Sequence, residues 1–433
     1  MTLFRTSMAL GVSAAALMAA SSASAAGFYL QEQSARGAGR AYSGEVADTG
    51  TASVWWNPAA LSGVERGELH GSLSGIFVDS EVSDDGSTIT RPGQAEAPVG
   101  GRSSVDDVVQ RGYLPSMAGA WRLTDRVVLG LSVASPYSFT SNYPGDSWTR
   151  YDALKSRLLT IDVQGTAAVQ VNDWLNVGAG VSLQYSDATL TSAVPNLSPL
   201  LADGRQVLTG DGWDAGWTVG AQATPNDRLT IGASYRSKVE HTLDGHVSIN
   251  GLLGPAAAAN MEVDGAASFT TPWMAIVGAR YRVTDQLTLN AQIQRIGWSE
   301  FESIDVHLPG GATQVTEQNY KDVTTAAVGV DYQWRPDLAF RAGVQYDPTP
   351  TPDEGRSARV PDGDRWLFAV GATKTVGENL NLDVAATYIT FADSEINRDD
   401  VLFDGTALAT PVALRGDVEG SAIVLSAGAR WAF

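Results

Sequence analysis

Residues 26–60 have the sequence AGFYLQEQSARGAGRAYSGEVADTGTASVWWNPAA, and this stretch decides how the whole chain folds. It is rich in Gly, Ala and Ser, and it holds two apolar clusters, Phe28-Tyr29-Leu30 and Val54-Trp55-Trp56. Neither cluster extends into the sustained alternation of a strand. Large aromatic side chains favour burial, yet a segment this short cannot bury them by itself. Because a long series of alternating segments follows, we expect a plug inside a β-barrel.

The first 25 residues have the features of a secretory signal peptide. Arg5 supplies the positive start, residues 8–20 form the apolar centre, and Ala23-Ser24-Ala25 is the small-residue cleavage signal. Ala26 is therefore the expected first mature residue. The 433 residues contain no Cys, so no disulfides are expected after export.

Composition and charge exclude several classes of protein. The mature part has no apolar run of about 18 residues or more, which excludes a helical membrane protein. A net charge of -19 argues against nucleic-acid binding, which needs a basic surface. Acidic residues gather in segments that we expect to be external loops, such as Asp79 to Asp85 and Asp399-Asp400. They favour solubility through mutual repulsion, or else they bridge divalent cations to lipopolysaccharide.

Short polar turns recur along the chain, and each precedes alternating apolar residues. They are Thr124-Asp125-Arg126, Asn172-Asp173-Trp174, Asn226-Asp227-Arg228, Thr284-Asp285-Gln286, Arg335-Pro336-Asp337 and Gly377-Glu378-Asn379. Asp and Asn suit such turns because their side chains bond to nearby backbone. Between them lie longer segments rich in Gly, Pro and Asp. Short turns at one end and long loops at the other are typical of an outer-membrane barrel, with the turns in the periplasm.

Fourteen strands fit around these turns, which gives an all-β, antiparallel transmembrane barrel. The expected strands span 67–82, 112–123, 126–135, 155–172, 174–191, 213–224, 228–242, 268–283, 286–304, 321–335, 338–347, 364–376, 379–393 and 418–433. In the strand 174–191, Leu175, Val177 and Val181 share one face, and Gly180 and Ser182 lie on the other. A closed barrel can turn such an apolar face to lipid because no backbone group remains unpaired.

Aromatic residues mark the strand ends. Tyr185, Tyr281 and Tyr388 lie where a barrel would meet the membrane interfaces. The last strand alternates and ends in Phe433. This terminal aromatic resembles the signal that the barrel-assembly machinery reads, so that machinery is an expected partner.

The start of the mature chain resembles that of FadL-type outer-membrane proteins. The matching residues are Ala26-Gly27-Phe28, Leu30, Gly39-Arg40-Ala41-Tyr42-Ser43-Gly44-Glu45 and Asn57-Pro58-Ala59. That family transports long-chain fatty acids, and some relatives import aromatic hydrocarbons. The resemblance implies a fourteen-stranded barrel in a Gram-negative outer membrane, with residues 1–25 as signal peptide, 26–66 as an N-terminal hatch and 67–433 as the barrel.

No catalytic or metal motif stands out. The sequence lacks a Gly-x-Ser-x-Gly elbow, a phosphate loop and a His-Glu-x-x-His motif. Its histidines, His70, His241, His246 and His307, lack metal-ligand spacing, and we expect solvated side chains, most of them in loops. We therefore expect no enzyme activity, no metal and no cofactor.

Two apolar loop segments could capture a hydrophobic ligand. One contains Leu197, Leu200 and Leu201, and the other is residues 249–261 with Leu252 and Leu253. Both are too apolar for free external loops. The family resemblance implies an initial binding groove here, and the alternative is that the two loops pack on each other as a lid.

Arg150, in Trp148-Thr149-Arg150-Tyr151, matches an Arg-Tyr pair of the family and could hold a carboxylate through its planar fork. The alternative is an ion pair with Asp146 or Asp152. Arginines on the lumen side of the strands are further candidates for the carboxylate contact, although buried charges need partners. We expect Arg236, Arg280, Arg341 and Arg430 to pair with Asp162, Asp331 or Asp383.

Ser135 and Pro136 end the apolar run of the third strand. Proline removes a ladder donor, so the strand either stops here or kinks. The resemblance implies an inward kink that opens a side window in the wall, and the alternative is a strand that ends in its loop.

The features together predict passive uptake of a hydrophobic molecule by a monomer. Loops capture the ligand, and a lumen pocket beside Phe28 and Leu30 holds it. A shift of the hatch, which is held by the Asn57-Pro58-Ala59 region, then connects the pocket to the side window. The first hypothesis is a long-chain fatty acid. The alternatives are an aromatic hydrocarbon importer and an adhesin or structural barrel.

Overall fold

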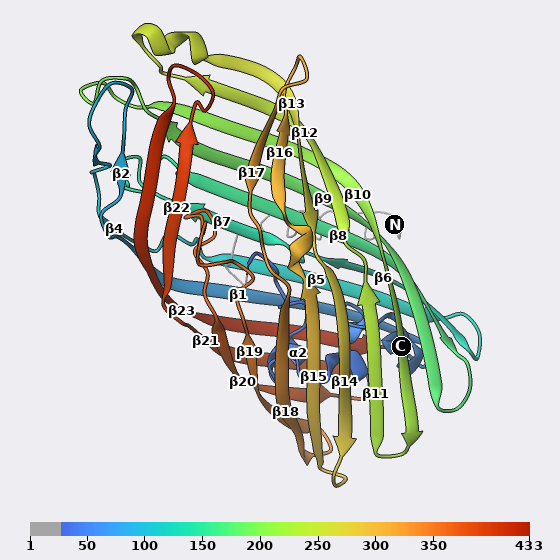
Figure 1. The fold of residues 1–433 in the computed structure, drawn as a ribbon. Helices are drawn as coiled ribbons and strands as arrows, with labels where there is room; N and C mark the ends of the chain where they lie inside the picture. Colours follow the sequence, from blue (N-terminus) through green and yellow to red (C-terminus); the bar gives the residue numbers. More distant parts are fainter. Residues whose placement is uncertain (1–26) are drawn as a thin grey trace, which may run out of the picture.

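The computed structural model describes residues 27–433, so the predicted signal peptide and Ala26 lie outside the described residues. The chain forms a closed antiparallel β-barrel with fourteen strand positions, which confirms the predicted fold class (Figure 1). Strand β1 (Gly67–Asp84) pairs with β23 (Thr410–Ala432) from Glu68↔Ala432 to Asp84↔Gly416, and this pairing closes the ring.

Several of the fourteen positions consist of two elements separated by a short break. Between β1 and β23 the wall contains, in order, β5 (Gly112–Arg122), β6 (Val127–Ala134) with β7 (Ser138–Asn142), β8 (Lys155–Gln170), β9 (Leu175–Val194), β10 (Gly204–Asn226), β11 (Leu229–Arg236) with β12 (Val239–Asn250), β14 (Trp273–Arg282) with β13 (Met261–Thr271), β15 (Leu287–Gly297) with β16 (Ser303–His307), β18 (Val323–Arg335) with β17 (Thr313–Glu317), β19 (Leu338–Asp347), β20 (Arg365–Val376), and β21 (Leu380–Phe391) with β22 (Ser394–Leu402). The loop after β1 adds β2 (Thr88–Ile89), β3 (Ala97–Pro98) and β4 (Ser104–Asp106).

The remaining elements are short helices. They are α2 (Ala35–Ala38), η1 (Glu45–Ala47), η2 (Thr51–Ser53), η3 (Pro58–Gly63), η4 (Gly254–Ala259) and η5 (Trp298–Glu300). Within residues 27–433, no helix has the length and apolar character that crossing a membrane requires.

All six predicted turns join neighbouring strands at one end of the barrel, as expected. In the turn between β8 and β9, Asn172 Oδ1 accepts hydrogen bonds from the backbone N–H groups of Trp174 and Leu175. Asn226 does the same for Arg228 and Leu229. The side-chain bonding that favours Asn in turns therefore operates here.

The alternation of side chains matches a wall between lipid and lumen. On β9, Val181 and Leu183 are 64% and 54% exposed, whereas Ser182 and Gln184 are each 2% exposed. The apolar residues face outward and the small or polar residues face inward, which is the pattern of a membrane barrel. Aromatic pairs line the outer surface, such as Tyr185 with Trp213, whose ring centroids lie 5.2 Å apart.

Several strands are longer than predicted. The acidic runs expected in loops lie mainly in strands, with Asp79 on β1 and Asp399 and Asp400 on β22. β10 pairs with β9 as far as Gly204↔Val194 and with β12 as far as Arg205↔Asn250, so the two apolar loops shrink to residues 195–203 and 251–260. An antiparallel ladder continues wherever a partner strand exists, and it does not need lipid. Conversely, the expected strand 286–304 is interrupted by η5.

Residues 27–64 lie inside the ring of strands, where Figure 1 shows α2 behind β15 and β18. Inward-facing glycines let this segment approach the wall. A Cβ at Gly232 would lie 2.0 Å from the carbonyl oxygen of Val46, and one at Gly343 would lie 2.1 Å from that of Arg40. Only glycine fits such close backbone contacts. The role of this segment as a hatch stays a prediction.

Candidate functional site: a lumen pocket, an arm and a strand gap

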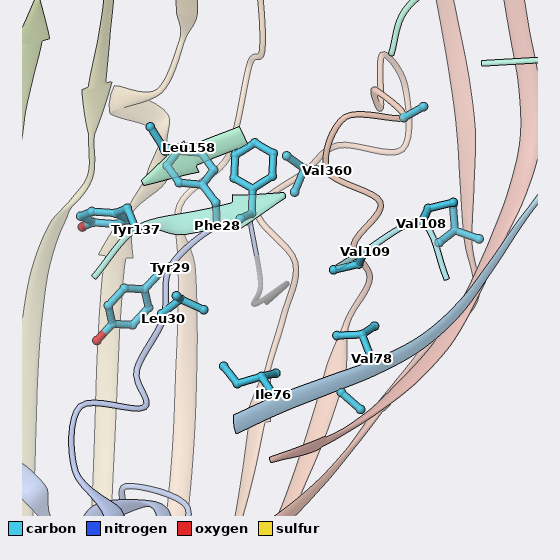
Figure 2. Packing of buried hydrophobic residues seen from close by; sticks show 14 of the residues in the cluster. Phe28, Tyr29, Leu30, Ile76, Val78, Val108, Val109, Tyr137, Leu158 and Val360 are labelled. Carbon is cyan, nitrogen blue, oxygen red and sulfur yellow. The ribbon is translucent and has the colours of Figure 1, made fainter. Parts of the chain in front are cut away.

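An apolar cavity of about 680 Å³, counted with its open mouth, lies between the N-terminal segment and the wall. Its lining is Phe28, Phe139, Arg157, Leu158, Ala188, Leu190, Leu208, Thr209, Gly210, Leu243, Ala267, Phe269, Phe301, Ile304, Gln318, Tyr320, Arg359 and Val360. We call it the lumen pocket. Figure 2 shows Phe28 beside Leu158 and Val360, which come from three distant parts of the chain. The apolar lining suits a hydrophobic ligand.

Two arginines give the lumen pocket a charged border. Arg157, on β8, pairs with Asp187 on β9. Arg359 lies in the loop between β19 and β20, where its Nη1 donates to Ser156 Oγ at 3.2 Å. Burial lowers the pKa of Arg359, and Asp152 opposes that shift. A carboxylate at this border would find two guanidinium groups whose present partners are side chains of the wall and loops.

Phe28 anchors the start of the N-terminal segment in an aromatic cluster. Its ring centroid lies 4.9 Å from that of Trp298 and 5.1 Å from that of Phe301, both in edge-to-face geometry. Tyr137 and Phe139 complete the surround at 5.9 Å each. Phe28, which was predicted to line the pocket, does so, whereas Leu30 is buried but is not part of the lining.

The third strand is interrupted where the sequence places Ser135 and Pro136. β6 ends at Ala134 and β7 begins at Ser138, and the pairing of β5 with β6 stops at Met117↔Val133. Residues 112–116 of β5 extend beyond this point, where they pair with β1 but not with the third strand. The reason is the proline, which has no N–H to donate. We call this interruption the strand gap.

The N-terminal segment fills the strand gap from inside. The backbone N–H of Leu30 donates to the carbonyl oxygen of Pro136 at 2.7 Å, and Tyr29 forms an antiparallel bridge with Tyr137. Gln33 Nε2 donates to the carbonyl oxygen of Ser135 at 3.1 Å. We call residues 27–34 the arm. It supplies backbone contacts that a neighbouring strand would make in an unbroken wall.

Residues 35–64, which we call the body, are held to the wall by buried ion pairs. Arg40 Nη2 pairs with Glu45 and lies 2.6 Å from Asp48 Oδ2, and Arg40 Nη1 lies 3.3 Å from Asp331 on β18. Arg280, on β14, joins Asp48 and Asp331 at 3.2 Å each. Burial alone would raise the pKa of Asp48, but the surrounding guanidinium groups hold it well below its usual range.

The predicted ion pairs of the lumen arginines are confirmed. Arg236 lies 4.0 Å from Asp162, and Arg430 lies 2.9 Å from Asp383. Arg280 and Arg341 both reach Asp331, at 3.2 Å and 2.6 Å. These arginines are therefore occupied by structural partners.

Asn57, Pro58 and Ala59 fix the body to the wall. Asn57 Nδ2 donates to the carbonyl oxygens of Val46 and Ala221, at 2.7 Å and 3.0 Å. Its Oδ1 accepts from the backbone N–H of Ala59 at 2.9 Å and so caps η3, which Pro58 begins. The three residues lie apart from the lining of the lumen pocket.

The apolar loops pack together and also expose leucines. Val194, Leu252 and Ala256 form a buried cluster, against which Leu197 packs, together with Phe403 and Leu408 from the loop between β22 and β23. Leu200, Leu201 and Leu253 remain 93%, 41% and 51% exposed. The sequence had not indicated that the loop between β22 and β23 contributes, because Phe403 and Leu408 are isolated apolar residues in a polar stretch.

Arg150 is bonded to loop residues and does not line the lumen pocket. Its Nε lies 3.0 Å from Asp203 Oδ2, and its Nη groups donate to the carbonyl oxygens of Val99 and Gly100 at 2.8 Å each. The predicted ion pair of Arg150 with Asp146 or Asp152 is therefore wrong. Asp203 takes that place because the loop after β9 folds across the loop that carries Arg150.

The expectation of solvated histidines is wrong for two of the four. His70 on β1 is buried in the lumen, and His241 on β12 is buried between Ser186 and Thr271. His241 Nδ1 also lies 3.3 Å from Asp214. Both lie within the predicted strands 67–82 and 228–242, and their side chains are buried rather than turned to solvent.

Comparison with known proteins extends over nearly the whole chain. The sequence model of a family described as "Outer membrane protein transport protein (OMPP1/FadL/TodX)" matches residues 16–433. A long-chain fatty acid transport protein of Escherichia coli is 27% identical over 427 residues, which covers 90% of this chain and 91% of the relative. Outer membrane protein P1 of Haemophilus influenzae is 26% identical and covers 87% of this chain and 88% of its own length.

Solved structures share the fold. A Pseudomonas aeruginosa FadL homologue superposes with a TM-score of 0.82 at 23% identity, covering 94% of this chain and all of that one. The Pseudomonas putida toluene transporter TodX superposes with a TM-score of 0.65 at 18% identity and covers 94% of this chain and 99% of its own. The same architecture is thus found in proteins named for different cargoes.

Proposed function

The chain belongs to the OMPP1/FadL/TodX family of outer-membrane transport proteins, and from that premise we propose that it takes up long-chain fatty acids. It is a transporter of hydrophobic compounds in the outer membrane of a Gram-negative bacterium. The family contains relatives named for fatty acids and relatives named for toluene, so the cargo must be argued from the residues of this chain.

The charged border of the lumen pocket supports a fatty acid. Arg157 and Arg359 line the same apolar cavity, and neither has the dense set of partners that occupies Arg40 or Arg150. A fatty acid offers an apolar chain for the cavity and a carboxylate for a guanidinium fork. A hydrocarbon offers no acceptor to these two cations, which would keep their present partners Asp187 and Asp152.

The route follows from the exposed leucines, the pocket and the strand gap. Leu200, Leu201 and Leu253 offer apolar surface to a ligand arriving from outside. The ligand then enters the lumen pocket beside Phe28. Displacement of the arm would uncover the strand gap at Ser135 and Pro136, through which the ligand leaves sideways into the membrane. In this route residues 27–64 act as a hatch, of which the arm is the part that moves.

Binding of oleate to the purified protein tests the cargo. We expect the double variant Arg157→Gln/Arg359→Gln to bind radiolabelled oleate at least about 100-fold more weakly, since each charge-assisted contact contributes about 1.5–3 kcal/mol. Binding of hexadecane should be unchanged. Arg295→Gln is the matched control, because Arg295 is a half-exposed arginine that pairs with Asp322 away from the pocket. Equal loss of oleate and hexadecane binding would contradict the proposal.

The alternative cargo is a monoaromatic hydrocarbon, which the many aromatic and aliphatic side chains of the pocket favour. Growth of a deletion strain on limiting oleate or limiting toluene separates the two cargoes. Normal growth on both without the protein would contradict either transport function and favour an adhesin or structural barrel. Insertion by barrel-assembly machinery, contact with lipopolysaccharide and a monomeric state stay part of the proposal.

A further inference from the structure

The loop between β19 and β20, residues 348–364, folds back against the arm and the wall, where much of it is buried. Its sequence is polar and rich in proline, yet Arg356 and Ala358 are fully buried and Asp362 is 1% exposed. Arg356 Nη1 lies 2.9 Å from Asp362 Oδ1, and Arg356 Nε donates to the carbonyl oxygen of Glu395. The two opposite charges neutralise each other, which permits a loop of this composition to be buried.

Asp362 holds the beginning of the arm. The backbone N–H of Gly27 donates to Asp362 Oδ2 at 2.9 Å, and the hydroxyls of Thr349 and Thr351 donate to the same carboxylate at 2.5 Å and 2.7 Å. Gly27 has a φ of +63°, and a Cβ there would lie 2.9 Å from the ring of Trp298. The loop and the arm therefore meet in one tightly fitted contact.

Arg359 lies three positions before Asp362 and reaches the lumen pocket. Its Nε is 3.8 Å from Asp152 Oδ1, which is a loose ion pair. Asp152 has other partners besides Arg359. It accepts hydrogen bonds from Ser357 Oγ at 2.7 Å and from the N–H of Ala358 at 2.8 Å, and Arg398 lies 3.6 Å away. Asp152 can thus release Arg359 to another carboxylate without becoming an unpaired buried charge.

We propose that Arg359 is the residue through which a carboxylate-bearing ligand, once bound in the lumen pocket, releases the arm. A ligand carboxylate in the lumen pocket draws Arg359 away from Asp152 and moves residues 359–362. Asp362 then leaves Gly27, and the arm loses its first anchor. The inference rests on the proposed function and adds a specificity to it: an apolar ligand without a carboxylate fills the same pocket and leaves the arm docked.

Arg157 provides the matched control. It lines the same pocket, but it lies on β8, whose ladder with β9 is continuous from Lys155↔Thr191 to Gln170↔Asn176. β8 also pairs with β7 at Thr140↔Arg157, so this strand is fixed on both sides, and a ligand that pulls on Arg157 does not displace Asp362 from Gly27. Binding depends on both arginines, whereas release of the arm depends on Arg359.

Hydrogen exchange of the arm amides in bilayer nanodiscs tests this coupling. The Leu30 N–H, which donates to Pro136, reports on docking. We expect saturating oleate to accelerate exchange of residues 27–34 about tenfold, and oleyl alcohol to leave it unchanged. Arg157→Gln should keep the acceleration at saturating oleate, and Arg359→Gln should abolish it. Asp362→Asn should accelerate exchange without any ligand.

Oleate binding measured on the same samples separates the two proposals. If wild-type protein binds no oleate, the proposed function fails and this inference fails with it. If oleate binds and the two arginine variants release the arm equally, the inference is overturned and the proposed function stands. Heat-induced mobility shifts on gels establish that each variant is folded, and Asp362→Asn provides a ligand-free result if Arg359→Gln does not fold.

Discussion

The arm and the body of the N-terminal segment are both buried, but only the body has charged groups that form ion pairs. In the body, Arg40, Glu45 and Asp48 belong to an ion-pair network that extends to the wall. In the arm, Gln31 Nε2, Glu32 Oε2 and Gln33 Oε1 are buried without a partner in the described part of the chain. The longer body also has such atoms, Arg36 Nε, Trp56 Nε1 and Ser62 Oγ, so the difference lies in the ion pairs. No ion pair connects the arm to the wall among residues 27–433.

This difference indicates which part of the segment can move. Removing one partner of a buried ion pair costs about 3–5 kcal/mol, so the body resists displacement. Each unpaired buried polar atom costs about 1–3 kcal/mol, and the arm bears this cost without an ion pair to the wall. The aromatic cluster around Phe28 offsets that cost. The body is thus held more firmly than the arm, in agreement with the proposal that the arm is the part that moves.

The largest effect is expected when the body network loses its central cation. Arg40→Ala leaves Glu45, Asp48 and Asp331 without the guanidinium they share. We expect the free energy of unfolding to fall by about 3–5 kcal/mol in urea titrations in detergent micelles. Arg40→Lys, which keeps the charge but loses the planar fork, should cost less. Wild-type stability of Arg40→Ala would contradict the anchoring role of the body.

A smaller and pH-dependent effect is expected in the arm. Burial raises the pKa of Glu32 above its ordinary value of 4.5, while Arg365 lowers it and Asp347 raises it. The docked arm therefore prefers protonated Glu32. Docking should be strongest below about pH 4.5, weaken as the pH rises towards the raised pKa, and level off above it.

Hydrogen exchange of residues 27–34 between pH 4 and pH 8, corrected for the intrinsic rate, measures this dependence. Glu32→Gln should remove it and increase protection at pH 8 by about tenfold for each unit by which the pKa is raised. Exchange in Glu32→Gln that still follows the wild-type pH profile would show that another group governs the arm.

The smallest effect is expected at the exposed loops, which contact neither the arm nor the body. Leu200→Ser/Leu253→Ser removes two exposed apolar side chains. We expect uptake of oleate to fall about three- to tenfold at limiting supply and to recover at high supply, because capture is lost and the pocket is intact. Unchanged uptake at limiting supply would remove these leucines from the route.

Much of the fold could be predicted because the periodicity of a barrel wall is local. The pattern of Leu175, Val177 and Val181 and the Asn172 turn each lie within a few residues, and both were predicted correctly. Proline at position 136 likewise indicated the interruption of a strand, because its missing N–H is a property of one residue.

The rest depends on contacts between distant residues. Asp203 pairs with Arg150 across 53 positions, and a nearer aspartate was the expected partner. Residues 348–364 resemble an ordinary external loop until Arg356 and Asp362 neutralise each other inside the barrel. The sequence therefore pointed to Phe28 but not to Arg157 or Arg359, which only the folded chain brings to one pocket. Apolar residues on either side of Arg359 are the one local signal that could have indicated it.

A disulfide between the arm and the strand gap is the most direct test of the central claim. Because the chain contains no Cys, Tyr29→Cys/Tyr137→Cys introduces a single possible bridge. The antiparallel pairing of these residues places their Cα atoms about 4.5–5.5 Å apart, which suits a disulfide. Ala35→Cys/Ser72→Cys is the control in the body, where the Ala35 N–H donates to Ser72 Oγ at 3.0 Å.

We expect oxidised Tyr29→Cys/Tyr137→Cys to take up no oleate and to recover uptake when a reductant opens the bridge. The oxidised Ala35→Cys/Ser72→Cys control should transport normally in both states. Undiminished uptake with the arm locked to Tyr137 would contradict the account, because the ligand would then leave the barrel without moving the arm.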